Sequence, residues 1–210
     1  MTAATWLCTL RAVAVWGLSG VPGAPAAPPI VHLRVFAHAT MERAALEQAM
    51  STAGGLLESA GIDIEWQDCG AGGHTCTPAE SAPQVTVLLM PVTKFTRDDV
   101  AAEVLHGLST PVVTVLVYMP NLEDRLRTVQ QSAAGRSNPG LATLRLHHLV
   151  GLAIAHEVGH GFGLSHGTSG VMKAPIVPGD LLALATSRLA FSSREAAALR
   201  RSVMTVNQRP

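Results

Sequence analysis

Residues 156–166 read HEVGHGFGLSH, and the fold predicted for this sequence depends chiefly on this stretch. His156 and His160 are four residues apart, so on a helix their side chains lie on the same face. Two imidazoles placed in this way can bind one zinc ion through nitrogen. Glu157 follows the first histidine, and its carboxylate can reach a water molecule at the metal without being a ligand itself.

Gly163 indicates how a third ligand joins this pair. Glycine adopts positive φ at little cost, so it can end the helix and turn the chain sharply. His166 is then expected to return to the metal held by His156 and His160. Three neutral histidines leave a fourth position for water, which is typical of a catalytic zinc site and not of a closed structural one. The alternative, a histidine-rich helix end with surface imidazoles, explains neither Gly163 nor Glu157.

We therefore expect one catalytic Zn²⁺ ion, held by His156, His160 and His166. Glu157 is expected to act as the general base that takes a proton from water during hydrolysis of a peptide bond. The expected partner is a peptide or protein substrate. Two other functions stay open at this point. One is a zinc-retaining binding or structural protein with little turnover, and the other is a zinc hydrolase of a non-peptide bond.

The stretch matches the signature H-E-x-x-H-x-x-G-x-x-H, and the chain resembles the metzincin zinc peptidases. Residues 169–172 (SGVM) resemble the Met-turn of that group, with Met172 as the methionine beneath the zinc. A weaker similarity to short, exported, bacterial zincin-like proteins extends over residues 61–69, the helix that carries the histidine motif, residues 170–173 and the C-terminal helices. One residue departs from the pattern, because Ala174 stands where some metzincins carry a tyrosine that approaches the metal.

This resemblance implies an α+β, zincin-like fold. Its expected parts are a twisted mixed β-sheet over the active-site helix and a second backing helix, with C-terminal helices after the Met-turn. An edge strand of such a sheet would border the cleft and pair with an extended substrate. Residues 91–111 are the candidate region for that strand, although the sequence also allows a short helix at 98–106.

Hydrophobic patterns predict the remaining elements. In residues 30–37, for example, Val31, Leu33 and Val35 share one face of a strand. Thr40 is expected to cap the backing helix, and Ser192 begins a capping box that opens the last helix. Strands are predicted at 30–37, 62–66, 85–90 and 112–118, helices at 40–60, 120–134, 141–163, 178–186 and 192–204, and a turn-rich loop at 135–140.

The N-terminal 26 residues have the features of a signal peptide. Arg11 precedes an apolar run at 12–18, residues 19–23 break the helix, and Ala24-Pro25-Ala26 offers small residues for cleavage. The run is shorter than the roughly 20 residues that a membrane span needs. We expect a single mature domain at 27–210, secreted or periplasmic, with no stable membrane insertion. A retained N-terminal anchor is the alternative.

Cleavage after residue 26 would remove Cys8 and leave Cys69 and Cys76. Two cysteines seven residues apart in an exported protein suit a local disulfide bond. Two free thiols or a redox pair are the alternatives, although the spacing is not the C-x-x-C of redox motifs.

The overall composition is that of a globular domain. Of the 210 residues, 48% are hydrophobic and 14% are charged, which excludes a disordered chain. The net charge is zero, whereas a nucleic-acid-binding protein usually carries a basic excess. We therefore expect no nucleic-acid partner.

Overall fold

A computed structural model describes residues 27–37, 41–70, 76, 83–92, 100–106 and 113–207 of the chain. The predicted signal peptide and the predicted helix cap at Thr40 lie outside these residues. Within the described residues, no helix combines the length and the apolar character needed to cross a membrane.

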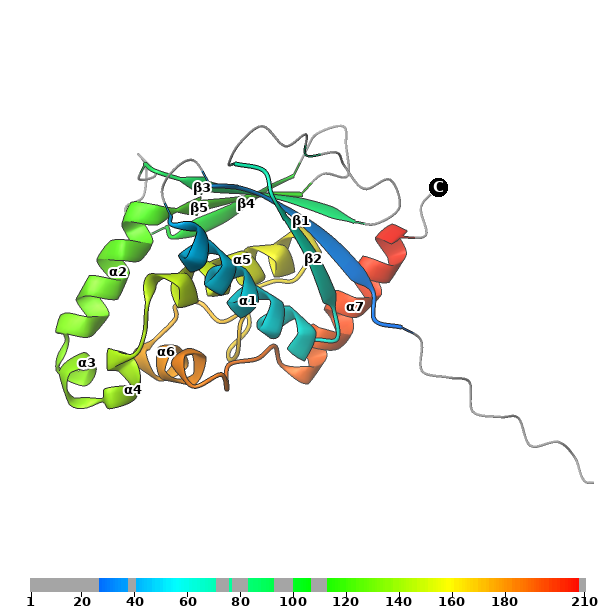
Figure 1. Ribbon diagram of the computed structural model, residues 1–210. Helices are drawn as coiled ribbons and strands as arrows, with labels where there is room; N and C mark the ends of the chain where they lie inside the picture. The colour runs from blue at the N-terminus through cyan, green and yellow to red at the C-terminus, as the bar shows by residue number, and fades with distance from the viewer. Residues whose placement is uncertain are drawn as a thin grey trace, which may run out of the picture.

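The described residues contain a mixed five-stranded β-sheet in the order β2-β1-β3-β5-β4 (Figure 1). The first four of these strands are parallel, and β4 runs antiparallel to β5 at one edge. The strands are β1 (Ile30–Ala37), β2 (Asp63–Asp68), β3 (Gln84–Met90), β4 (Ala102–His106) and β5 (Val113–Tyr118).

Helices lie mainly on one side of this sheet, with α1 and α5 beneath it and α6 further below (Figure 1). With this arrangement the described chain belongs to the α+β class. The helices are α1 (Arg43–Ser59), α2 (Met119–Gln131), α3 (Ala133–Ser137), α4 (Pro139–Ala142), α5 (Leu146–Gly161), α6 (Pro178–Ala185) and α7 (Ser193–Asn207).

The core lies between the sheet and the helices α1 and α5. Alternate residues of β1, such as Val31 and Leu33, are buried, while the residues between them are only partly buried. This two-residue period is expected for a sheet that packs one face onto helices. Helix α5 contributes an almost continuous buried stretch from Leu149 to Val158 apart from His156, because it packs against α1 on one side and against β4 and β5 of the sheet above it.

The backbones of α1 and α5 approach each other closely where their side chains are small. A Cβ atom on Gly151 of α5 would lie 2.6 Å from the carbonyl oxygen of Ala49 and from Cβ of Thr52. Any side chain at residue 151 would therefore push α5 away from α1. Since α5 carries the histidine motif, this contact helps to fix the position of the motif beneath the sheet.

Two sequence predictions need correction around the start of α5. The helix predicted at 141–163 begins only at Leu146, and the loop predicted at 135–140 is partly helical, in α3 and α4. Local capping is the physical reason. Oδ1 of Asn138 accepts the N–H of Gly140 at 2.9 Å and opens α4. Arg145 is extended, and its N–H donates to Nδ1 of His148 at 3.0 Å, so α5 starts separately.

The ambiguous region at 91–111 contains a strand and not a helix in its described part. Residues 102–106 form β4, whose register pairs Glu103 with Leu116 and Val104 with Val115 of β5. Because β4 is last in the strand order, no described strand pairs with its other side. The described sheet thus ends in an antiparallel strand within the region that was the candidate for an edge strand.

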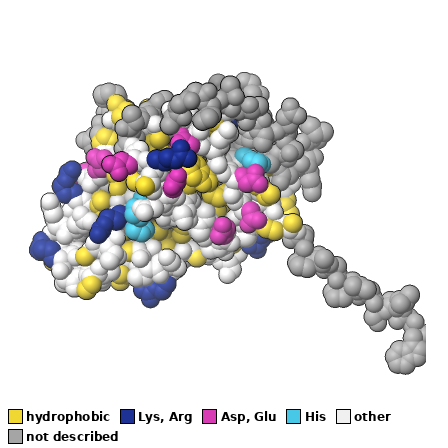
Figure 2. Space-filling view, in the orientation of Figure 1, with side chains coloured by type: hydrophobic (Ala, Val, Ile, Leu, Met, Phe, Trp, Pro, Cys, Tyr) yellow, Lys and Arg dark blue, Asp and Glu magenta, His cyan; other side chains and the backbone are white. Residues whose placement is uncertain are grey.

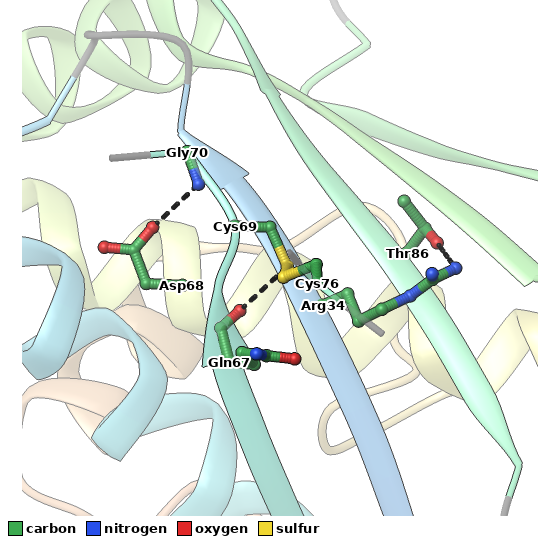
Figure 3. Close-up of a disulfide and its surroundings, with 7 residues drawn as sticks. All are labelled: Arg34, Gln67, Asp68, Cys69, Gly70, Cys76 and Thr86. Atoms are coloured by element: carbon green, nitrogen blue, oxygen red, sulfur yellow. Dashed lines mark hydrogen bonds between the residues drawn. A yellow bond between two sulfur atoms is a disulfide. The ribbon is translucent and has the colours of Figure 1, made fainter. Parts of the chain in front are cut away.

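The predicted disulfide between Cys69 and Cys76 is present, with the two Cα atoms 5.6 Å apart (Figure 3). The segment that leads into it is tied to the sheet. The N–H of Cys69 donates to the carbonyl of Val35 on β1 at 2.7 Å, and the N–H of Gly70 donates to Oδ1 of Asp68 at 3.0 Å. These hydrogen bonds hold the Cys69 end of the disulfide next to the sheet.

Charged side chains of both signs are interspersed on the face of the molecule that carries α1 (Figure 2). Two of the local pairs on the described surface are Arg43 with Glu47 and His32 with Glu65, at 3.1 and 3.3 Å. Neither sign dominates this face, in keeping with the zero net charge of the sequence.

Candidate metal centre

Helix α5 ends in a Schellman motif, and this motif reverses the chain after the histidine pair. The N–H of Leu164 donates to the carbonyl of Gly159, and the N–H of Gly163 donates to that of His160, both at 2.9 Å. These are the two hydrogen bonds that define the motif. Gly163 has φ of +86° and open space around its Cβ position, so the left-handed backbone alone explains the glycine.

The reversal brings all three predicted ligands together. One nitrogen of each of His156, His160 and His166 can be chosen so that all three lie within 4.8 Å of one another. The ring centroids are 4.7 to 5.3 Å apart. His156 and His160 are partly buried on α5, and His166 is exposed in the following loop. The cluster is thus accessible from one side.

Backbone carbonyls fix the orientation of two of these rings. Nδ1 of His156 lies 2.8 Å from the carbonyl oxygen of Val171, and Nδ1 of His160 lies 2.7 Å from that of Leu164. A carbonyl only accepts hydrogen bonds, so each Nδ1 must carry the proton. In the neutral rings both Nε2 atoms are then bare acceptors, and they face each other at 3.1 Å.

Two lone pairs that face each other in this way can be bridged by a cation. Burial lowers the pKa of His156 to about 4 and also holds the pKa of His160 below its usual value, so both rings are neutral at pH 7. Two nitrogens bound to one tetrahedral zinc ion at about 2.1 Å would lie roughly 3.4 Å apart, close to the separation seen here. The donor set and its outer hydrogen bonds therefore fit zinc.

The segment after His166 packs beneath the ligand helix. It closes on itself through a hydrogen bond of 2.8 Å from the N–H of Gly167 to the carbonyl of Met172. Met172 is fully buried, and a Cβ atom on Gly159 would lie 2.5 Å from its sulfur. The methionine therefore lies against α5 at the turn between the two helical ligands, where a larger residue at 159 would displace it.

Glu157 is a buried charged residue beside the histidines, with 7% of its surface exposed. Burial and, to a smaller extent, the nearby carboxylate of Glu103 together raise the pKa of Glu157 to about 7. Glu103 lies on β4 and accepts a hydrogen bond from the hydroxyl of Tyr118. A divalent cation at the histidines would oppose both effects and favour the carboxylate form of Glu157.

A cleft of about 620 Å³ opens beside the three histidines. Its walls come from the start of β4, from α2, α5 and α6, and from the segment after Met172. It is lined by His156, Glu157 and His166 together with Val100, Ala101, Ala102, Leu122, Arg125, Leu149, Leu152, Ala153, Lys173, Ala174, Pro175, Ile176 and Leu181. The cleft is large enough for a side chain of a bound peptide.

Glu195 is a neighbour of the centre that the sequence did not reveal. The predicted capping box is present, since Glu195 accepts the N–H of Ser192 at 2.8 Å and opens α7. Its carboxylate also lies against Gly167 and close enough to His156 to influence the pKa of that ring. The capping role follows from the S-x-x-E spacing, whereas the proximity to the histidines depends on how α7 packs.

The other two histidines of α5 lie outside this centre. Nδ1 of His148 accepts the N–H of Arg145, and the ring of His147 contacts that of His148 with centroids 4.2 Å apart. Both side chains thus belong to the start of the helix.

Comparison with known proteins finds similar structures but no similar sequence or family. No protein-family model matches the chain, and no curated protein matches it. The structure is similar to the crystal structure of a zinc-dependent peptidase from Methanocorpusculum labreanum (strain Z), with a TM-score of 0.48 and 17% sequence identity. That match covers 80% of this chain and 99% of the other.

Proposed function

We propose that this protein is an exported, metzincin-type zinc endopeptidase in which His156, His160 and His166 hold one zinc ion. The observation that carries the proposal is the pair of bare Nε2 atoms 3.1 Å apart, with His166 beside them. Neutral rings in this arrangement repel each other unless a cation lies between them. Glu157 at the same cleft supplies the base that peptide hydrolysis needs.

Different residues at the proposed centre have different roles in the reaction. Zinc, when bound, acts as a Lewis acid that polarises a carbonyl group and acidifies water. A carboxylate oxygen of Glu157 takes the proton of the attacking water and then passes it to the nitrogen of the leaving amine. The carbonyls of Val171 and Leu164 hold two histidine rings in the tautomer that leaves Nε2 free.

Substrate binding is proposed at the outer edge of β4. The start of β4 lines the cleft, and no described strand pairs with its outer side. An extended peptide can add to such an edge through main-chain hydrogen bonds, with one of its side chains in the cleft. The scissile bond would then pass close to Glu157 and the histidines.

Digestion of a mixed peptide library tests the proposed activity. The mature protein should cleave internal peptide bonds, a zinc chelator should abolish cleavage, and added Zn²⁺ should restore it, because water activation depends on the metal. Mass spectrometry of the products identifies the bonds that are cut. Undiminished cleavage after complete removal of zinc would contradict the proposal.

Export gives a separate prediction. When the protein is made in an exporting cell, we expect its N-terminus at or near Ala27 and a bond between Cys69 and Cys76. N-terminal sequencing and intact mass under non-reducing conditions measure both features. Retention of Met1, or alkylation of both thiols without reduction, would show that this part of the account is wrong.

A further inference from the structure

The cleft beside the histidines contains a cation for which the described residues supply no carboxylate partner. Arg125 on α2 lines the cleft and is partly buried, and its Nη2 donates to the carbonyl of Ile176 at 3.2 Å. In the described part of the chain, no carboxylate lies within ion-pair distance of its guanidinium group. A guanidinium group has five N–H donors, so most of its hydrogen-bonding capacity is available to a ligand.

The other charges of the cleft are already satisfied or belong to the metal centre. Lys173 forms an ion pair of 2.8 Å with Asp180, which also accepts the N–H of Val177 at 2.9 Å. Glu157 lies beside His156 and serves the metal centre. Arg125 is therefore the lining side chain whose positive charge a ligand can meet.

The rest of the cleft lining is largely apolar, and the positions of its residues show which way the cleft extends from the metal centre. Leu149 lies seven residues before His156 on α5, which corresponds to about 10 Å along the helix axis. Leu122, from the same helix as Arg125, and Leu152 also line the cleft. The cleft thus extends from the metal centre along α5 towards α2, with apolar walls and a cation on α2.

We propose that Arg125 binds a carboxylate of the peptide substrate while the aliphatic part of that residue packs against the apolar walls. This inference rests on the proposed peptidase function and specifies its substrate class. Arg is suited to the role, because its planar fork can donate two parallel hydrogen bonds to one carboxylate. The carboxylate can belong to an acidic side chain or to the C-terminus of the peptide.

Peptide binding to a zinc-loaded Glu157→Gln variant tests the inference without turnover. Fluorescently labelled peptides are prepared in pairs whose members differ only by Glu or Gln at one position. The substituted positions are those that flank a cleaved bond, or every position in turn if no bond is cut. Each is made with a free and with an amidated C-terminus. Fluorescence anisotropy gives the Kd of each peptide for this protein and for the same protein carrying Arg125→Met.

Matched variants separate charge recognition from a structural role. Arg127→Met is the control, because Arg127 is on the same helix, pairs with Asp124 at 2.8 Å and does not line the cleft. Loss of the hydrogen bond from Arg125 to Ile176 would weaken the binding of all peptides by the same factor. The readout is therefore the ratio of the Kd values of the neutral and the charged peptide of each pair. Arg125→Lys should retain part of the preference, since it keeps the charge but not the fork.

We expect the peptide with the carboxylate to bind at least about tenfold more tightly than its neutral partner, as a hydrogen bond to a charged group provides. Arg125→Met should abolish that ratio, and Arg127→Met should leave it unchanged. If the Kd changes between the Glu and Gln peptides, Arg125 binds an acidic side chain. If it changes between the free and the amidated peptides, Arg125 binds the C-terminus. Equal binding of all four peptides, or an unchanged ratio in Arg125→Met, would overturn the inference.

The binding and cleavage experiments test the role of Arg125 and the peptidase function separately. If the zinc-loaded wild type cuts no peptide but the carboxylate preference appears, the peptidase function is wrong and the binding site stands. If the wild type cuts peptides and the preference is absent, the role of Arg125 is wrong and the peptidase function stands.

Discussion

Replacement of Glu157 by Gln should lower the rate of peptide cleavage by a factor of about 10² or more while leaving the zinc content unchanged. The two side chains have the same shape, but the amide cannot take a proton from water. Glu157 is positioned for that task because it lies one residue, about 100° around the helix, from His156 and lines the same cleft. Zinc content and peptide hydrolysis are measured on the same preparations.

Glu123→Gln is the matched control for this experiment, since Glu123 is exposed on α2 and does not line the cleft. It should retain both zinc and activity. A Glu157→Gln variant that cleaves as fast as the wild type would mean that another group is the base. If the wild type and the variant both hold zinc and neither cleaves any peptide in a broad library, a binding protein or a hydrolase of a non-peptide bond becomes the better account.

Replacement of His160 by Ala should abolish zinc binding. It removes one of the two Nε2 atoms that face each other at 3.1 Å and leaves His156 and His166 as a two-ligand site. A site with three protein ligands is the usual minimum for a tightly held catalytic zinc ion. Zinc per chain is measured by mass spectrometry after dialysis and should fall from about one to near zero.

Two further variants make the result for His160 specific. His147→Ala changes a histidine of the same helix outside the centre and should keep full zinc occupancy. His166→Gln acts in an exposed loop position, so it should lose zinc without affecting the core. Circular dichroism of all three reports whether the fold survives. Full zinc occupancy in folded His160→Ala or His166→Gln would show that the assigned ligands are wrong.

The arrangement of the three histidines could be predicted from the sequence because it depends on helix geometry within residues 156–166. The spacing of His156 and His160 places them on one face, and Gly163 takes the positive φ that turns the chain towards His166. The strands of the sheet were also predictable, since their β-branched runs alternate or are continuously apolar. None of these inferences depends on contacts between distant segments.

The parts that were missed depend on long-range packing. Glu103 approaches Glu157 only because β4 pairs antiparallel with β5, and no pattern in residues 91–111 fixed that pairing. Arg125 reaches the cleft only because α2 packs against α5. A charged residue on a polar helix normally faces solvent, so the sequence gave no reason to single out Arg125 from its charged neighbours.

The most direct test of the account is an anomalous difference map, recorded at the zinc absorption edge, from crystals of the mature protein. We expect one strong peak per chain, bound at about 2.1 Å by one nitrogen from each of His156, His160 and His166. A map without a peak among these three rings, or with zinc bound by other residues, would contradict the account.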